Sequence, residues 1–376
     1  MPRALFDDPD GTLAMLRDSV ETLSARMPGP ASLRAKRLRK GDVDRALWSA
    51  MAEAGWTGLL LPEDLGGAAL GLAEQAVLSE ALGRALIAEP IAAGAVFASV
   101  LLRDAPASAE RDRLAAGLAD GSLLVAPAWR LPAPRSAGRP LKAAADGAGV
   151  LLQGELQFVD AAASATDFLV LAALEGEAVL LSVPASSNGV SVEEKAGVDG
   201  ATIGTLRFDK VAVAEENVLY RAGSLDALTE APLLHARIAA AAELAGIASK
   251  AVEMTIAYTK DRVQFGKPIA SFQAVQHRLV DMWSDAEFAC AAVVNAVERQ
   301  SERDARAAKL AVLAAKARAG DAATSITRRA VHLHGAMGFT DEHDIGLYLK
   351  RAVALSATLG QPEALRLEFV DLERAA

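Results

Sequence analysis

Between two predicted helices the chain reads Asp261-Arg262-Val263-Gln264-Phe265-Gly266-Lys267-Pro268-Ile269, and Phe272-Gln273 follow closely. Gly266 and Pro268 predict a turn here. An arginine offers a bidentate charged fork for a pyrophosphate, and an aromatic ring offers a flat apolar face for a purine. The alternative interpretation is a plain helical hairpin with a solvated arginine, and both interpretations stay open on these residues alone.

Long helices are predicted on both sides of this turn. An alanine-rich helix is expected over 233–259. An amphipathic helix is expected to begin at a Ser271 cap, with apolar residues three and four apart at Phe272, Val275, Leu279 and Met282. A further helix is predicted from about Asp304 to His334, ending at Gly335, because glycine is favoured just past a helix end.

Two other regions precede these helices. Residues 1–120 contain apolar, alanine-rich helical stretches such as 73–102. Residues 121–220 hold short apolar runs between Gly, Pro and Ser clusters, and an alternating segment at 202–213. Short strands at regular spacing predict a small β-barrel or sandwich. The chain is therefore predicted to consist of a helical domain, a β domain and a helical bundle.

Composition narrows the class of protein. The 376 residues are 52% apolar and 23% charged, so the chain can bury a large core. The formal net charge of −9 argues against the basic surface of a nucleic-acid-binding protein. The single cysteine, Cys290, cannot form an internal disulfide or a zinc site alone, and we expect it to be buried. We expect no signal peptide and no transmembrane helix, hence a cytoplasmic protein without membrane partners.

A second informative segment is Val331-His332-Leu333-His334-Gly335-Ala336-Met337-Gly338-Phe339-Thr340-Asp341-Glu342. Gly335 and Gly338 allow another group to approach the backbone closely. His332 and His334 are two residues apart, so on a helix they point to different faces. Because only His343 stands near them in sequence, we predict no metal site.

Both segments resemble the C-terminal signatures of the acyl-CoA dehydrogenase family: Arg262-Val-Gln-Phe-Gly-Lys-Pro-Ile with Phe272-Gln273, and His334-Gly-Ala-Met-Gly-Phe-Thr with Tyr348-Leu-Lys-Arg351. Three further stretches are similar to the family: Leu61-Pro-Glu-Asp-Leu-Gly-Gly67, Ser79-Glu-Ala-Leu-Gly-Arg84 and Leu206-Arg-Phe-Asp-Lys-Val-Ala-Val213. The resemblance implies an α+β multi-domain fold: an N-terminal α-helical domain at 1–120, a central β-barrel at 121–222 and a C-terminal four-helix bundle at 223–376.

The resemblance also implies a cofactor and a reaction. The family binds FAD between the subunits of a dimer or tetramer. Arg262, Gln264, Phe265 and Gln273 would hold the ADP part of one FAD, and His332, Gly335 and Gly338 would approach the FAD of a neighbouring subunit. In the family a glutamate takes the α-proton of an acyl-CoA thioester, and the β-hydride passes to flavin N5. Electrons then leave through an electron-transferring flavoprotein.

The chain departs from the family at the catalytic base. The usual glutamate follows the second signature, but Leu355-Ser-Ala-Thr-Leu-Gly360-Gln-Pro contains no acid. An alternative family base precedes an arginine that resembles Arg237, and here that position is Ala236. Glu243 lies about two helical turns further on the same face. It is the candidate base, with Arg237 a candidate site-lining residue. The alternative is that Glu243 is a polar helix residue paired with a neighbouring group.

The middle domain departs as well. The family's segment beside the flavin is replaced by Leu123-Leu-Val-Ala-Pro-Ala-Trp129, in which Trp129 is either a flavin-stacking residue or a core residue. The chain's ending resembles a shorter bacterial branch that serves steroid or other bulky acyl-CoA catabolism, in part as α2β2 assemblies. Three functions stay open: an FAD-dependent acyl-CoA dehydrogenase, a catalytically incomplete FAD-binding subunit of a hetero-oligomer, and a related flavoenzyme that uses oxygen or a different substrate.

Overall fold

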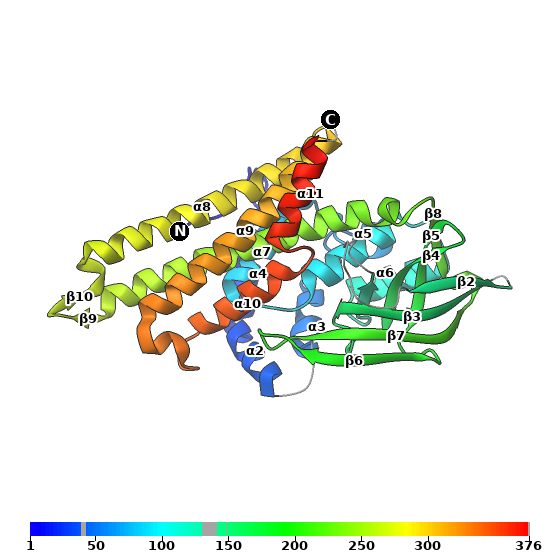
Figure 1. The fold of residues 1–376 in the computed structure, drawn as a ribbon, viewed down its shortest axis with the longest axis horizontal. Coiled ribbons are helices and arrows are strands. Elements are labelled where there is room, and N and C mark those ends of the chain that lie inside the picture. The colour runs from blue at the N-terminus through cyan, green and yellow to red at the C-terminus, as the bar shows by residue number, and fades with distance from the viewer. Residues whose placement is uncertain (39–42, 130–140, 148, 375–376) are drawn as a thin grey trace. The chain divides into compact units, whose positions relative to one another are not determined.

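The computed structural model describes residues 1–38, 43–129, 141–147 and 149–374 (Figure 1). The chain forms two compact units, each assembled from separated segments. The first unit contains Met1–Arg34, Leu72–Ala88 and Arg237–Ala376, and the second contains Ala35–Gly71 and Glu89–Ala236. The domain ranges 1–120, 121–222 and 223–376 divide the chain differently and stay a prediction.

The first unit is a bundle of helices. Its segments include all or part of α1 (Thr12–Arg26), α2 (Gly29–Leu38), α4 (Leu72–Ala85), α7 (Leu225–Asp261), α8 (Gln273–Gln300), α9 (Ala305–His334), α10 (Ile345–Ala357) and α11 (Pro362–Arg374). Helix α9 is central, because it contacts α8, α10 and α11. Its buried side is rich in alanine, including Ala311, Ala315 and Ala319. Small side chains let neighbouring helix axes approach closely.

Two glycines set the contact between α4 and α7. A Cβ atom on Gly83 would lie 2.1 Å from the carbonyl oxygen of Glu243. A Cβ atom on Gly246 would lie 2.0 Å from the carbonyl oxygen of Glu80. Neither distance leaves room for a side chain, so the two backbones touch directly. This contact fixes the part of α7 that carries Glu243.

The second unit combines short helices with two sheets. Besides the end of α2 and the start of α7, its helical elements are α3 (Arg45–Glu53), η1 (Glu63–Leu65), η2 (Ile91–Val96), α5 (Phe97–Asp104), α6 (Ala109–Ala119) and η3 (Glu215–Asn217). Its strands are β1 (Val125–Ala128), β2 (Lys142–Asp146), β3 (Gly149–Asp160), β4 (Asp167–Leu174), β5 (Glu177–Pro184), β6 (Val190–Ala196), β7 (Thr202–Val213) and β8 (Val218–Ala222). The predicted strand segments are thus confirmed.

The strands form two four-stranded sheets, ordered β1-β4-β5-β8 and β2-β3-β7-β6. Strands β1 and β4 pair in parallel, and the other neighbours pair antiparallel. The sheets face each other, since β1 contacts β3 and β2 contacts β4. The prediction of a closed barrel needs correction, because among the described residues each sheet keeps its own edge strands. The arrangement is a sandwich, and the helical–β–helical order of the predicted fold is confirmed.

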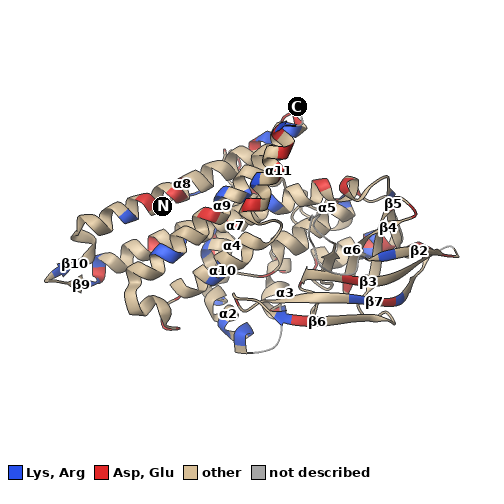
Figure 2. Ribbon diagram, viewed as in Figure 1, with Lys and Arg blue, Asp and Glu red and all other residues tan. Residues whose placement is uncertain are grey.

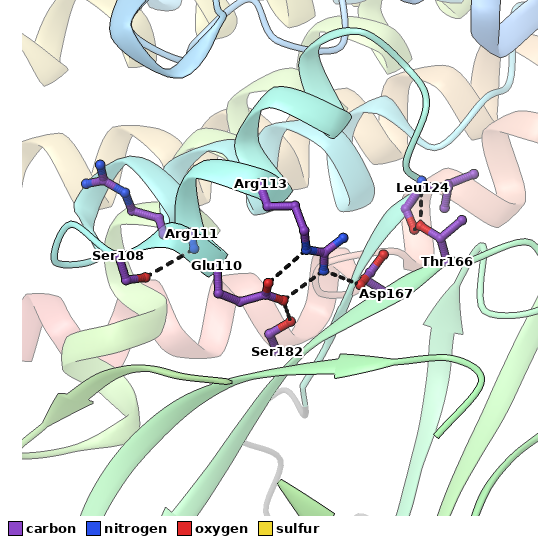
Figure 3. A network of polar contacts seen from close by, with 8 residues as sticks. All are labelled: Ser108, Glu110, Arg111, Arg113, Leu124, Thr166, Asp167 and Ser182. Atoms are coloured by element: carbon purple, nitrogen blue, oxygen red, sulfur yellow. Dashed lines mark hydrogen bonds and ion pairs between the residues drawn. The ribbon is translucent and has the colours of Figure 1, made fainter. Parts of the chain in front are cut away.

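A charged network attaches α6 to the first of these sheets (Figure 3). Arg113 on α6 contacts Glu110 and Asp167, in both cases with 2.7 Å between nitrogen and oxygen. The hydroxyl of the buried Ser182 on β5 donates to Glu110 at 2.6 Å. Hydrogen bonds from Arg113 and Ser182 hold the pKa of Glu110 below its usual value. The network therefore fixes the orientation of α6 over strands β4 and β5.

Two predicted helix starts need correction. Helix α7 begins at Leu225 rather than Leu233 and includes Pro232, whose missing N–H removes only one helical hydrogen bond. Ser271 does not cap α8, because its hydroxyl donates to the Pro268 carbonyl at 2.7 Å within the turn η4 (Ile269–Ser271). The predicted limits of α9 are confirmed: Asp304 caps its first turn, and Gly335 follows its last residue.

Helix α7 is the one described helix that is long and apolar enough to cross a membrane. Of its most apolar window, 78% is buried inside the structure. Such burial is typical of the core helix of a water-soluble protein. Charged residues of both signs are interspersed along the helices and strands (Figure 2).

Candidate functional site

The stretch that follows α7 is a short β-hairpin with a two-residue turn. Its strands, β9 (Val263–Gln264) and β10 (Lys267–Pro268), pair antiparallel around Phe265 and Gly266. Both turn residues have positive φ, 53° and 78°, as type I′ hairpin turns require. A phenylalanine in this conformation is unusual. Backbone strain of this kind is common at functional sites, so the turn is a candidate site on this ground.

The predicted cofactor-binding residues of this region gather at the hairpin. All four are exposed: Arg262, Gln264, Phe265 and Gln273. Phe265 is 92% exposed. Its ring meets that of Phe272 edge-on at 6.1 Å, and Lys267 Nζ lies 4.4 Å from the Phe272 centroid. The hairpin presents aromatic faces beside cations, which suits a purine attached to a pyrophosphate.

The end of α9 and the turn η5 (Gly335–Phe339) hold the other predicted cofactor residues. His332 is exposed, and its Nδ1 lies 3.1 Å from Arg278 Nη1. A Cβ atom on Gly335 would meet nothing within 4 Å, so the backbone there is open to an approaching group. A Cβ atom on Gly338 would lie 2.5 Å from the Val331 carbonyl oxygen. Gly338 therefore serves a close contact within its own chain.

An aromatic cluster that the sequence did not reveal lies behind this segment. The ring of the buried His334 stacks on Tyr258 at 4.3 Å and lies 4.4 Å from the ring of His343. The Tyr258 hydroxyl donates to the His334 carbonyl at 3.1 Å, which ties α7 to α9. Burial lowers the pKa of both His334 and His343. As the spacing predicted, His332 and His334 point to different surroundings, one exposed and one buried.

Glu243 lies in a buried ion pair. Arg351 Nε and Nη2, from α10, lie 2.8 Å and 2.7 Å from the same oxygen of Glu243, Oε1. An arginine at this distance stabilises a charged carboxylate and makes it a weaker proton acceptor. This geometry matches the alternative interpretation of Glu243, a polar helix residue paired with a neighbouring group.

Arg237 is buried and engages the segment in which the usual family base is absent. Its Nε donates to the Leu359 carbonyl oxygen at 3.0 Å. Its Nη1 and Nη2 contact the Glu368 carboxylate on α11 at 3.3 Å and 3.0 Å. Arg237 therefore connects α7 to the turn between α10 and α11.

A second cation beside this turn was also missed. Lys316 on α9 is fully buried, and its Nζ donates to the carbonyl oxygens of Leu355 at 3.2 Å and Ser356 at 3.1 Å. One signal was available in the sequence: Lys316 is three and four residues from Leu313 and Val312, which lie on the buried face of α9. A lysine at helical spacing on an apolar face predicts a buried amine.

Trp129, in the second unit, packs against its own chain. Its ring stacks on Phe97 with centroids 4.8 Å apart and an interplanar angle of 25°. The side chain is half-buried. This contact is of the kind expected for a core residue.

Comparisons with known proteins cover nearly the whole chain. Residues 11–122 match the family description "Acyl-CoA dehydrogenase, N-terminal domain", and residues 225–370 match "Acyl-CoA dehydrogenase, C-terminal domain". The acyl-CoA dehydrogenase IpdE2 of Mycobacterium tuberculosis is 30% identical over 362 residues, which span 94% of each protein.

Two solved structures have the same fold. A variant of the Tcur3481–Tcur3483 steroid ACAD superposes with a TM-score of 0.85 at 30% identity, covering 96% of this chain and 98% of that one. The ChsE4–ChsE5 complex from Mycobacterium tuberculosis superposes with a TM-score of 0.87 at 26% identity, covering 98% of this chain and 99% of that one.

Proposed function

This chain belongs to the acyl-CoA dehydrogenase family, and on that premise we propose that it is an FAD-binding subunit that needs a second subunit for a complete active site. As a member of the family it is an oxidoreductase acting on CH–CH donors. The observation that carries the proposal is the buried Glu243–Arg351 ion pair. In this pair Arg351 binds Glu243, the one acid that the sequence offered as a catalytic base.

The hairpin residues fit the ADP part of FAD. Phe265 offers an apolar face for the adenine, while Arg262 and Lys267 bring positive charge for the pyrophosphate. Gln264 and Gln273 add hydrogen-bonding amides at the same exposed surface. When bound, FAD supplies the acceptor for the hydride from the substrate β-carbon. The exposure of Phe265 supports this assignment, because its ring is free to receive a ligand.

The end of α9 fits a role toward a partner subunit. Gly335 leaves its backbone open, and His332 with Arg278 adds polar groups on the exposed surface. We assign these groups to the FAD held by a neighbouring subunit of a dimer or tetramer. Gly338 lets the turn η5 pack directly against the Val331 backbone at the end of α9, and so fixes the position of these groups. Trp129 is assigned to the core of the second unit, because its ring already stacks on Phe97.

The substrate in this proposal is an acyl-CoA with a bulky, steroid-like acyl group. It is supported by the steroid ACAD among the similar structures. A hetero-oligomer is supported by the similarity to the ChsE4–ChsE5 complex. We place the enzyme in the cytoplasm, with an electron-transferring flavoprotein as its electron acceptor.

A second candidate function is a dehydrogenase that is complete by itself, with Glu243 as its base. The burial of Glu243 on the face of α7 that also carries Ala236 favours it. In that case Arg351 would have to release the carboxylate before it accepts the α-proton. The two candidates share fold, cofactor and reaction, and they differ in where the base resides.

The deciding experiment compares the chain expressed alone with the chain co-expressed with a second acyl-CoA dehydrogenase subunit encoded beside it. Native mass and FAD per chain are measured, followed by anaerobic mixing with a panel of acyl-CoAs. We expect substoichiometric FAD and no flavin bleaching for the chain alone, and bleaching for the co-expressed complex. A fully flavinated homo-oligomer that is bleached by substrate would overturn the proposal. Rapid reoxidation by oxygen with an oxygenated product would indicate a related flavoenzyme that uses oxygen.

A further inference from the structure

The turn between α10 and α11 has an unusual backbone. Leu359 and Gly360 follow one another with φ of 61° and 117°. Leucine rarely adopts a positive φ, so its surroundings must hold it there. A Cβ atom on Gly360 would lie 2.8 Å from the Leu365 side chain, which shows how closely the turn packs on α11.

Lys316 holds one end of this turn. The carbonyls of Leu355 and Ser356 belong to the last helical turn of α10, where carbonyls have no partner within the helix. Both accept hydrogen bonds from Lys316 Nζ. One turn further along α9, a Cβ atom on Gly320 would lie 2.7 Å from Ser356 Oγ. Helix α9 therefore lies directly against the end of α10.

Arg237 holds the other end. Its bond to the Leu359 carbonyl and its ion pair with Glu368 attach the turn to α7 and α11. Helices α9, α7 and α11 thus fix the backbone of residues 355–359, and the two anchoring side chains, Lys316 and Arg237, are buried basic groups.

Charged groups of both signs surround Lys316, and their effects on its pKa oppose one another. Arg237 and Glu243 face it from α7. Glu243 is paired with Arg351 of α10, and Arg237 with Glu368 of α11. On the side of α9 toward α8, Asp285 is bound by Arg318 and Arg329. Burial, assisted by Arg237 and opposed by Glu243, lowers the pKa of Lys316 to about 7.

We propose that Lys316 is a positioning residue that holds the α10–α11 turn through the Leu355 and Ser356 carbonyls, and that protonation of its amine favours release of the turn. A neutral amine still donates to both carbonyls, whereas an ammonium is far better solvated in water. The released turn exposes Lys316 to water, so the released state binds the proton more tightly. The catalytic consequence rests on the proposed function, since the resemblance places the reacting end of the substrate beside this turn.

Hydrogen–deuterium exchange of the full chain between pH 6.5 and 9 tests this inference, with rates corrected for intrinsic exchange. The experiment compares wild type, Lys316→Met and, as a control on the same helix, Lys309→Met. We expect protection of residues 355–361 to rise with pH in wild type and in the control. In Lys316→Met it should be independent of pH and about tenfold weaker at pH 9, because two buried carbonyls lose a donor. Parallel profiles for wild type and Lys316→Met would overturn the inference.

Two further measurements keep the test decisive. If Lys316→Met does not fold, the wild-type profile alone decides, because flat protection of 355–361 across this pH range contradicts the inference. In the active complex, Lys316→Met should lower the rate of flavin reduction and remove its pH dependence between 6.5 and 9, with KM unchanged. A complex that no acyl-CoA reduces would refute the proposed function, while the exchange profiles would still decide the role of Lys316.

Discussion

At the scale of single residues, the Glu243–Arg351 pair decides how the chemistry is assigned. A close cation stabilises the charged form of a carboxylate and so makes it a weaker base. Both short contacts of Arg351 reach the same carboxylate oxygen. The pair joins α7 to α10, so it also contributes to the packing of the first unit. Its structural and catalytic roles predict different outcomes when the carboxylate is removed.

We predict that Glu243→Gln destabilises the protein by about 3–5 kcal/mol, because it removes the charged partner of Arg351, whose side chain is only 12% exposed. Thermal and denaturant unfolding measure this loss. The double variant Glu243→Gln/Arg351→Gln should recover part of it, since no buried charge then lacks its counter-charge. In the assembled complex, folded Glu243→Gln should still allow flavin bleaching by substrate. A folded, FAD-loaded variant that substrate fails to reduce would instead identify Glu243 as the base.

Phe265 provides a second prediction at this scale. Its ring is almost fully exposed, so Phe265→Ala should leave the melting temperature unchanged. The loss of a stacking face should weaken FAD binding by roughly threefold to tenfold. Titration of the apo-complex with FAD measures the change. Val280→Ala is a suitable control, because Val280 is another exposed apolar residue, placed on α8 away from the hairpin. Equal affinities for wild type and Phe265→Ala would remove Phe265 from the cofactor site.

At the scale of elements, the direct contact of α4 with α7 positions the residues discussed above. Glycines on both helices permit this contact, and helix propensity disfavours them there by about 1 kcal/mol relative to alanine. Gly83 meets the backbone of Glu243 itself, and Gly246 lies three residues further along α7. A helix pair held at this separation fixes the height and rotation of Glu243 toward Arg351.

We predict that Gly246→Ala destabilises the protein by about 1–3 kcal/mol despite the better helix propensity of alanine, because its Cβ would collide with the Glu80 carbonyl. Gly223→Ala is the matched control: nothing lies within 4 Å of a Cβ there, and its φ is not positive. The control should change the free energy of unfolding by less than about 0.5 kcal/mol. A stabilising effect of Gly246→Ala would show that α4 and α7 can separate without cost.

At the scale of the whole molecule, buried titratable groups shape the dependence of stability on pH. In the folded protein the pKa of Lys316 is about 7, compared with 10.5 for the ordinary side chain. Between these values the unfolded chain holds a proton that the folded chain lacks. The free energy of unfolding therefore rises with pH through this window, by up to about 1.4 kcal/mol per pH unit. Below pH 7 both states are protonated, so the free energy of unfolding no longer changes with pH through Lys316 and the cost of burying its charge is present in full.

The difference between wild type and Lys316→Met isolates this effect from other titrating groups. We predict that the free energy of unfolding rises more steeply with pH in wild type than in Lys316→Met between pH 7 and 10. The difference between the two values should therefore change steadily across this range. Denaturant unfolding across this range measures both curves. Lys309→Met should follow the wild-type slope, because Lys309 lies on the same helix but is only half-buried. Equal slopes for wild type and Lys316→Met would mean that Lys316 titrates normally.

Much of the architecture was predictable because its signals are local. The limits of α9 follow from a capping aspartate, Asp304, and a glycine, Gly335, which act on adjacent backbone. The strand at 202–213 follows from alternation within the segment, and the strand at 149–160 from a short apolar run between turn-forming residues. Whether the two sheets close into a barrel was not predictable in this way, because closure depends on which edge strands pair. The start of α7 was misplaced because burial of its neighbours compensates for the single hydrogen bond lost at Pro232.

The sequence by itself determined the family, the turn between Arg262 and Gln273 and the absence of acids at Ala236 and 355–360, since each is a matter of residue identity and short spacing. Only the tertiary structure decided that Glu243 meets Arg351, 108 residues away in the chain, and that Lys316 anchors the end of α10. Partners so distant in sequence leave no periodic signal, because their encounter depends on how whole helices pack. That packing decides whether a buried carboxylate accepts a proton or balances a charge.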